Sequence, residues 1–263
     1  MKNKLLCFDV DGTLRDNVNH EVSPSTLMAL KRLKQEGYRL IISSGRGVDS
    51  LKRTGLMEML DWDGYVCNNG QNILDAHENV IFHAVLSEET ILATLKKAEE
   101  LGYAMVLKSQ PRVITKEPDE YVLESQRFFN NVIPDIGTYH GQEVDAMIVY
   151  GPRDYDYAPF FDIEGLAVMP GESTYADLTM KGISKATGIQ VFLDRFNLDG
   201  YIAFGDSLND WEMFKHADIS IAMGQGNQKL KDAATYTTKS IHDDGIYWAC
   251  THILHLFDES EGE

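Results

Sequence analysis

The stretch LLCFDVDGTL, residues 5–14, decides the fold. Its apolar run, residues 5–8, is short and unbroken, as is typical of a strand buried on both faces. Asp9 and Asp11 follow at once. Two carboxylates this close resist joint ionisation unless a cation or a shared proton offsets their repulsion. The stretch therefore predicts a buried strand whose carboxyl end is either strained without a function or binds a ligand.

Helix-like and strand-like segments alternate after this strand. Ser23 is a good N-cap for a helix that has Pro24 at its first position and ends before Gly37. A second buried strand is predicted within residues 38–47, and a second helix over residues 48–60. Strands separated by helices indicate an α/β fold with a doubly wound, Rossmann-like parallel sheet.

The middle of the chain has a different pattern. Between residues 85 and 178, amphipathic helices alternate with half-exposed strands, which is typical of a separate α+β unit. The first pattern then returns. We therefore predict a core formed by residues 1–84 and 179–263, split by an α+β insertion over residues 85–178.

The composition limits the possible partners and the location. The 263 residues include 24 Lys and Arg against 41 Asp and Glu, a net charge of −17. This balance argues against binding nucleic acid or an anionic membrane, but a bound divalent cation would still allow a small anionic substrate. We also expect no membrane segment and no signal peptide, and three reduced cysteines, so the expected location is the cytoplasm.

Polar residues gather where three predicted core strands end. The three ends carry Asp9 and Asp11, Ser43 and Ser44, and Asp206 and Asp210. A single Asp-x-Asp-Gly often forms only a turn, but the carboxyl ends of parallel strands meet at one edge of a sheet. Oxygen ligands in this number suit Mg²⁺. With a metal present, one of the first two aspartates is free to act as a nucleophile and the other as an acid and base.

The chain resembles the haloacid dehalogenase-like hydrolases, and among them the Cof-type phosphatases, which have a large cap inserted after the second motif. The segment DVDGT, residues 9–13, is similar to the first motif of that family. The resemblance implies that Asp9 forms an aspartyl-phosphate and that Asp11 protonates the leaving group. SSGR, residues 43–46, resembles the TGR segment of the family, which implies that Ser44 and Gly45 bind the phosphate.

Two further segments extend the resemblance. GDSLNDWEM, residues 205–213, is similar to the family pattern GDxxNDxxM. It implies that Asp206 binds Mg²⁺, that Asp210 supports it and that Asn209 lies near the phosphate. The implied metal set is Asp9, Asp11, Asp206 and Asp210.

The third motif of the family is a lysine, for which the chain offers Lys181 and Lys185. The segment GISKA, residues 182–186, resembles the family's Gly-Val-Ser-Lys-Gly and favours Lys185 as the catalytic, phosphate-binding lysine. A helix that begins after Ser184 would place Lys185 at its first position, where a cation is useful if an anion lies in front of it.

The expected function is therefore that of a Mg²⁺-dependent phosphatase. It would hydrolyse a small phosphorylated metabolite, a sugar phosphate by preference, through an aspartyl-phosphate. Two alternatives remain open from the sequence: a phosphotransferase or phosphomutase with the same catalytic groups, and a non-enzymatic switch that accepts a phosphoryl group. The expected assembly is a monomer or a weak homodimer.

Overall fold

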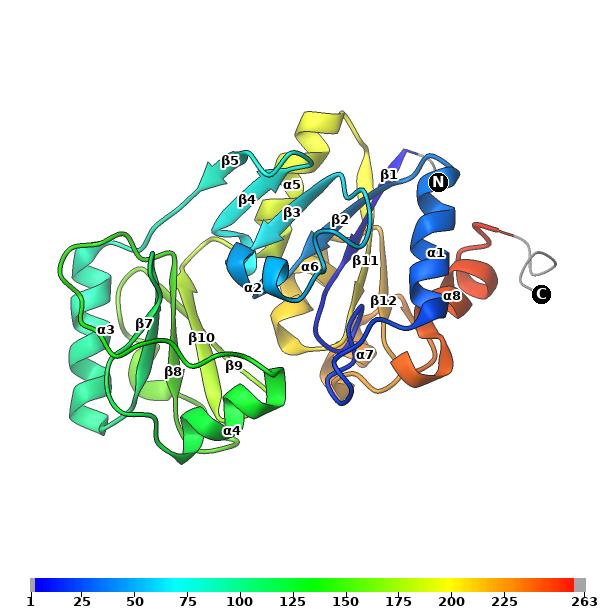
Figure 1. Cartoon of the computed structure of the whole chain (residues 1–263). Helices are drawn as coiled ribbons and strands as arrows, with labels where there is room; N and C mark the ends of the chain where they lie inside the picture. The colour runs from blue at the N-terminus through cyan, green and yellow to red at the C-terminus, as the bar shows by residue number, and fades with distance from the viewer. Residues whose placement is uncertain (1–2, 258–263) are drawn as a thin grey trace.

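The computed structural model describes residues 3–257 and contains two separate sheets (Figure 1). The strands of the eight-stranded sheet are β1 (Lys4–Phe8), β2 (Arg39–Ser43), β3 (Gly64–Cys67), β4 (Asn72–Asp75), β5 (Val80–His83), β11 (Gly200–Gly205), β12 (Ile219–Ala222) and β13 (Tyr236–Thr237). Those of the five-stranded sheet are β6 (Met105–Lys108), β7 (Val113–Ile114), β8 (Ala146–Tyr150), β9 (Leu166–Pro170) and β10 (Tyr175–Met180). We call the unit built on the eight-stranded sheet the core.

The core sheet has the order β13-β12-β11-β1-β2-β3-β4-β5. Its strands are parallel from β13 to β3, and β4 and β5 form an antiparallel edge. Strand β1 pairs with β2 on one side and with β11 on the other, so the chain builds the sheet outward from β1 in both directions. Such a reversal opens a crevice at the carboxyl ends of the central strands. The predicted doubly wound fold is confirmed.

Alternate side chains of β1 explain its unbroken apolar sequence. Leu6 and Phe8 belong to one apolar cluster with helix α1 (Pro24–Gln35), whereas Leu5 and Cys7 belong to a second cluster with helix α5 (Lys185–Phe196). Both faces of the strand are therefore buried. The core helices are α1 (Pro24–Gln35), α2 (Val48–Arg53), α5 (Lys185–Phe196), α6 (Trp211–His216), α7 (Gln228–Ala233) and α8 (Gly245–Trp248).

Helix α2 is shorter than predicted. The sequence pattern indicated a helix over residues 48–60, but the helix ends at Arg53. Gly55 follows in a left-handed conformation, with φ of 69°. Glycine adopts that conformation without steric cost, so the chain turns there and the later apolar residues pack as a loop.

The five-stranded sheet is antiparallel, in the order β7-β6-β8-β10-β9, and forms a unit that we call the cap with α3 (Glu88–Leu101) and α4 (Glu120–Phe129). Helix α3 packs on the face that carries Met105 and Met147, whereas Val122 of α4 packs against Val106 and Tyr150 on the opposite face. The predicted α+β character is confirmed, and the boundaries at residues 85 and 178 stay a prediction.

The segments that join the two units run side by side near β4 and β5 (Figure 1). Gln71 ties both of them to the core, since its Nε2 donates to the Ala84 carbonyl at 3.4 Å and its Oε1 accepts from the Met180 amide at 3.1 Å. Within residues 3–257, no helix combines the length and the apolar character that crossing a bilayer requires.

Candidate active site

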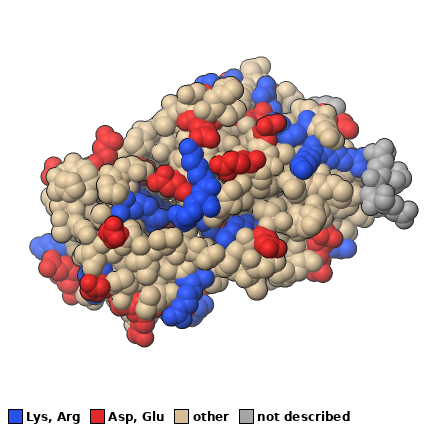
Figure 2. Space-filling model, in the orientation of Figure 1, with Lys and Arg blue, Asp and Glu red and all other residues tan. Residues whose placement is uncertain are grey.

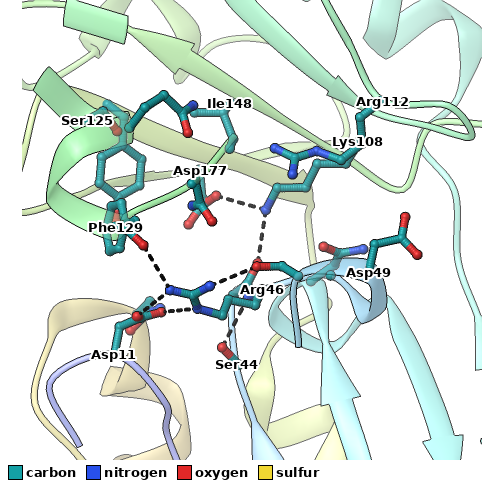
Figure 3. Close-up of a pocket in the computed structure, with 18 of the residues that line it drawn as sticks. Asp11, Ser44, Arg46, Asp49, Lys108, Arg112, Ser125, Phe129, Ile148 and Asp177 are labelled. Atoms are coloured by element: carbon teal, nitrogen blue, oxygen red, sulfur yellow. Dashed lines mark hydrogen bonds and ion pairs between the residues drawn. The ribbon is translucent and has the colours of Figure 1, made fainter. Parts of the chain in front are cut away.

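A pocket lies where the cap faces the carboxyl ends of the core strands (Figure 3). The core contributes Asp9, Asp11 and Ser44, and the cap contributes Lys108, Tyr150 and Asp177. Although the chain has a net charge of −17, Figure 2 shows Lys and Arg side chains gathered in the hollow of the face that it displays. Positive side chains at the mouth of a pocket favour an anionic ligand.

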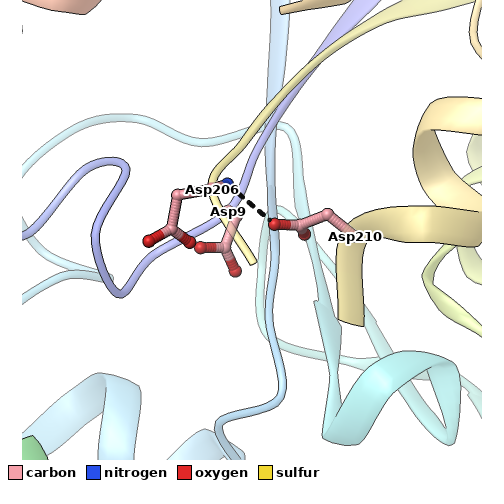
Figure 4. Close-up of side chains that lie close together, drawn as sticks. All are labelled: Asp9, Asp206 and Asp210. Atoms are coloured by element: carbon pink, nitrogen blue, oxygen red, sulfur yellow. Dashed lines mark hydrogen bonds between the residues drawn. The ribbon is translucent and has the colours of Figure 1, made fainter. Parts of the chain in front are cut away.

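Three buried aspartates form a cluster, two of which, Asp9 and Asp206, line this pocket (Figure 4). One carboxylate oxygen each from Asp9, Asp206 and Asp210 lies within 4.8 Å of the others. Asp9 directly follows β1 and Asp206 directly follows β11, so the pairing of these two strands brings the side chains together. Burial, and then the charge of Asp210, raise the pKa of Asp9 to about 7 against the opposing effect of Lys185. Burial, and then the charges of Asp9 and Asp210, also raise the pKa of Asp206.

Lys185 lies between two of these carboxylates. Its Nζ donates to Asp9 Oδ1 and to Asp210 Oδ1, each at 2.6 Å, and the residue is only 1% exposed. Burial alone lowers the pKa of Lys185, but the carboxylates of Asp210 and Asp9 outweigh burial and raise it. The ammonium is therefore charged. Burial raises the pKa of Asp9 and Asp206 in the absence of a further cation. If all three carboxylates ionise, the ammonium leaves two negative charges, which one divalent cation would balance.

The oxygens of the cluster differ in whether the protein already satisfies them. Asp210 Oδ2 accepts from the amides of Asp206 and Ser207, at 3.0 and 3.2 Å, while its Oδ1 accepts from Lys185. Asp206 Oδ1 is buried and has no hydrogen-bond partner within residues 3–257. A buried carboxylate oxygen with no donor suits a hard cation such as Mg²⁺. Asp9 and Asp206 could therefore hold the metal, and Asp210 orients its neighbours.

Gly12 shapes the loop over this cluster. Its φ is 80°, and a Cβ at this position would lie 1.9 Å from Asp206 Oδ2. No side chain can occupy that space, since real Cβ contacts do not approach so closely. The glycine that follows the two aspartates in the sequence therefore lets the loop lie against the Asp206 carboxylate.

Asp11 does not lie in the acidic cluster. Its two carboxylate oxygens accept from Arg46, from Nε and Nη2, each at 2.7 Å. This two-point pairing draws the carboxylate toward β2 and the cap, because Arg46 also donates to Ser50 Oγ at 2.8 Å and to the Phe129 carbonyl at 3.4 Å. The structure thus groups three of the four aspartates of the predicted metal set and places the fourth on a guanidinium.

Sequence reasoning did not single out Arg46 as a site residue. The signal was present in the segment SSGR, in which the arginine directly follows two of the expected phosphate-binding residues. Its partner in the pocket, Asp11, is 35 positions away, and the spacing alone could not pair them.

The remaining predicted site residues line the same pocket. Ser44 is buried and its Oγ accepts from the Arg46 amide at 3.1 Å. The Gly45 carbonyl accepts from Lys108 Nζ of the cap at 3.0 Å, which ties the cap to the core at this point. Asn209 Oδ1 accepts from Ser207 Oγ at 2.7 Å. Ser44, Gly45 and Asn209 all face the space above the acidic cluster.

The two candidate lysines are in different environments. Lys185 is the first residue of α5, whose N-cap Ser184 accepts from the Thr187 amide. Lys181 follows the end of β10, is exposed and uses its amide to donate to the Gly165 carbonyl at 2.8 Å. The structure therefore brings Lys185, and not Lys181, to the predicted site residues.

Comparison with known proteins identifies the family. A profile of the haloacid dehalogenase-like hydrolases matches residues 6–250. This chain belongs to the haloacid dehalogenase-like hydrolases. A Bacillus subtilis relative in this family, named "Putative phosphatase YkrA", is 28% identical over 256 residues, which cover 95% of this chain and 97% of the relative.

Two solved structures of haloacid dehalogenase-like phosphatases are similar over the whole fold. BT1666 from Bacteroides thetaiotaomicron superposes with a TM-score of 0.85 at 25% identity and covers 95% of this chain and 94% of its own. BT4131, described as a sugar phosphatase of subclass IIB, has a TM-score of 0.84 at 28% identity, and the match covers 95% of this chain and 98% of BT4131. The predicted family and the predicted class, a phosphoric monoester hydrolase, are confirmed.

Proposed function

We propose that this haloacid dehalogenase-like phosphatase hydrolyses a small phosphorylated metabolite with the help of Mg²⁺, through an aspartyl-phosphate on Asp9. The observation that carries the proposal is the buried cluster of Asp9, Asp206 and Asp210, with the Lys185 ammonium 2.6 Å from two of them, beside a pocket lined with cations. Such a site offers a nucleophile and several positive groups for a phosphoryl group.

In the first step, Asp9 attacks phosphorus and the bond from phosphorus to the leaving oxygen breaks. Asp11 gives that oxygen its proton, so the leaving group departs as an alcohol. Both carboxyl oxygens of Asp11 accept a hydrogen bond from Arg46. We propose that one of these two hydrogen bonds opens when Asp11 turns toward the leaving oxygen.

In the second step, Asp11 takes a proton from water, and the water oxygen attacks phosphorus. The bond between phosphorus and Asp9 breaks, which releases inorganic phosphate and restores both aspartates. Lys185, Ser44 and the amide of Asn209 hold the phosphoryl oxygens during both steps. Asp9 and Asp206 would hold a Mg²⁺ ion, which would supply positive charge to offset the charge of the phosphoryl group.

A sugar phosphate is the substrate class we propose for the pocket. The relative BT4131 is described as a sugar phosphatase, and the cap wall of the pocket presents groups that bind hydroxyls, among them Ser125, Gln126 and Tyr150. The cytoplasmic location and the monomer or weak homodimer expected from the sequence stay predictions.

The test is phosphate release from a panel of sugar phosphates and from p-nitrophenyl phosphate, with Mg²⁺ and with a chelator. Asp9→Asn keeps the size of the side chain and removes the nucleophile, so kcat should fall by at least about a thousandfold. Asp61→Asn, a matched change at an exposed aspartate of the core, is the control. Full activity in chelator would exclude the role of Mg²⁺. If Asp9→Asn retained a few per cent of the parental kcat or more, the aspartyl-phosphate mechanism would be excluded.

A further inference from the structure

The cap side of the pocket contains a cation that has no ion-pair partner in residues 3–257. Lys108 and Arg112 both extend into the pocket from the cap (Figure 3). Lys108 Nζ is neutralised by Asp177 Oδ1 at 3.2 Å. Arg112 has no ion pair within the described part of the chain, and its buried Nε has no hydrogen-bond partner there.

Arg112 cannot avoid being a buried, unpaired charge by losing its proton. Burial, the largest effect, lowers the pKa of Arg112, but a guanidinium stays charged at every physiological pH. A charge that is largely withdrawn from water and lacks an anion destabilises the folded protein. A partner supplied by a ligand would remove this cost, and binding energy at such a group is correspondingly large.

Two neutral groups near the same wall also have unused capacity. Gln126 Nε2 donates to the Tyr150 hydroxyl at 2.8 Å, so that hydroxyl accepts one bond and still has its own proton to donate. Gln126 Oε1 is buried and has no donor among residues 3–257. Both residues line the pocket with Arg112. The wall therefore presents unused donors on Arg112 and Tyr150 and an unused acceptor on Gln126.

We propose that the substrate carries a second anionic group on its leaving portion, and that Arg112 binds this group while the scissile phosphoryl group lies over the acidic cluster. The inference rests on the proposed phosphatase function and names its substrate class, a phosphomonoester with a carboxylate or a second phosphate. Tyr150 donates a further hydrogen bond to the anion, and Gln126 Oε1 accepts one from a neighbouring hydroxyl of the ligand. Arg112 is then the residue that separates acidic from neutral sugar phosphates.

The test compares substrates that differ in the second anion alone. 6-Phosphogluconate and sorbitol 6-phosphate differ by a carboxylate against a primary alcohol, and fructose 1,6-bisphosphate and fructose 6-phosphate differ by a second phosphate. One charge-assisted contact predicts that kcat/KM for the acidic member exceeds that for the neutral member by about tenfold to a hundredfold. The pair that shows the larger ratio identifies the anion as carboxylate or phosphate.

Arg112→Gln should remove this preference, because it removes the charged contact to the second anion. It should lower kcat/KM for the acidic substrate at least about tenfold more than for the neutral substrate. Arg112→Lys should recover part of the ratio. Arg153→Gln is the matched control, since Arg153 is an exposed cap arginine that pairs with Glu124 and does not line the pocket. Its ratio should equal that of the parent.

Binding gives a readout that does not depend on turnover. The dissociation constants of the same four compounds for the Asp9→Asn variant with Mg²⁺ should show the same preference, which Arg112→Gln should abolish in that background. The inference is overturned if the two members of each pair have equal dissociation constants, or if Arg112→Gln weakens the binding of both members equally. It is also overturned if none of the four compounds binds. Failure to hydrolyse p-nitrophenyl phosphate would instead refute the proposed phosphatase mechanism, while the binding comparison still decides the role of Arg112.

Discussion

Replacing Lys185 by methionine removes the ammonium and keeps the length of the side chain. The ammonium lies 2.6 Å from Asp9 Oδ1 and from Asp210 Oδ1, and all three groups are buried. Helix propensity alone predicts almost no effect at this position, since both residues are good helix formers. Breaking a buried ion pair from one side, however, leaves an uncompensated charge and costs about 3–5 kcal/mol.

This cost can be converted into a melting temperature. For a chain of this size, 1 kcal/mol corresponds to roughly 2–4 °C, so Lys185→Met should melt about 6–20 °C below the parent in chelator. Mg²⁺ should restore part of the difference, because the cation balances the charges that the ammonium balanced before. The rate should not recover. The loss of a preorganised cation at the phosphoryl group predicts a fall in kcat/KM of about a hundredfold or more.

Lys181→Met is the matched control, because Lys181 is exposed and only four positions away. Its melting temperature should change by less than about 2 °C and its kcat/KM by less than about threefold. Both variants are measured by thermal melts with chelator and with Mg²⁺, and by phosphate release. If Lys185→Met melts with the parent in chelator, or if Lys181→Met is the variant that loses activity, the assignment of the buried lysine is refuted.

Three further predictions concern the loop, the metal and the connection between the units. Gly12→Ala should lower kcat/KM more than about a hundredfold, because its Cβ would lie 1.9 Å from Asp206 Oδ2. Gly37→Ala is the control: the backbone there has a φ of 85°, but nothing lies within 4 Å of the new Cβ, so this variant should keep normal kinetics. The comparison separates the effect of backbone strain from that of a steric clash. Ca²⁺ should support less than about a tenth of the Mg²⁺ rate, measured as kcat after chelation and metal replacement, because its longer bonds and looser coordination disturb the in-line geometry. Gln71→Ala should speed hydrogen exchange in the two connecting segments and raise KM about threefold or more, and unchanged exchange there would count against a role in holding the cap.

The parts of the site that follow from strand order could be predicted from the sequence. Asp9 and Asp206 lie just beyond the ends of β1 and β11, which are neighbouring parallel strands. A buried parallel sheet has few ways to arrange its carboxyl ends, so polar residues at those ends converge. The unbroken apolar run before Asp9 was informative for the same reason, since it required helices on both faces.

The parts that depend on side-chain partners could not be predicted. Asp11 has the same sequence context as Asp9, yet Arg46 holds it away from the acidic cluster. The pairing depends on the direction of a long side chain from the loop that follows the neighbouring strand β2, which no periodicity encodes. That the buried Nε of Arg112 has no hydrogen-bond partner among the described residues is likewise visible only once the cap is folded. The end of α2 depends on a single glycine inside an otherwise helical pattern.

The cap sheet shows how recognition can change without loss of the fold. In β8, Met147 and Val149 face α3 inside the cap, whereas Ile148 and Tyr150 face the pocket. The sequence of β8 is apolar throughout, so it does not reveal which face meets the ligand. Since neighbouring residues of a strand point to opposite faces, substitutions on the pocket face leave the packing against α3 unchanged. The groups proposed to act on the phosphoryl group belong to the core and not to the cap sheet. Substrate preference, which we propose to depend on the pocket face and on Arg112, can therefore change independently of the chemistry.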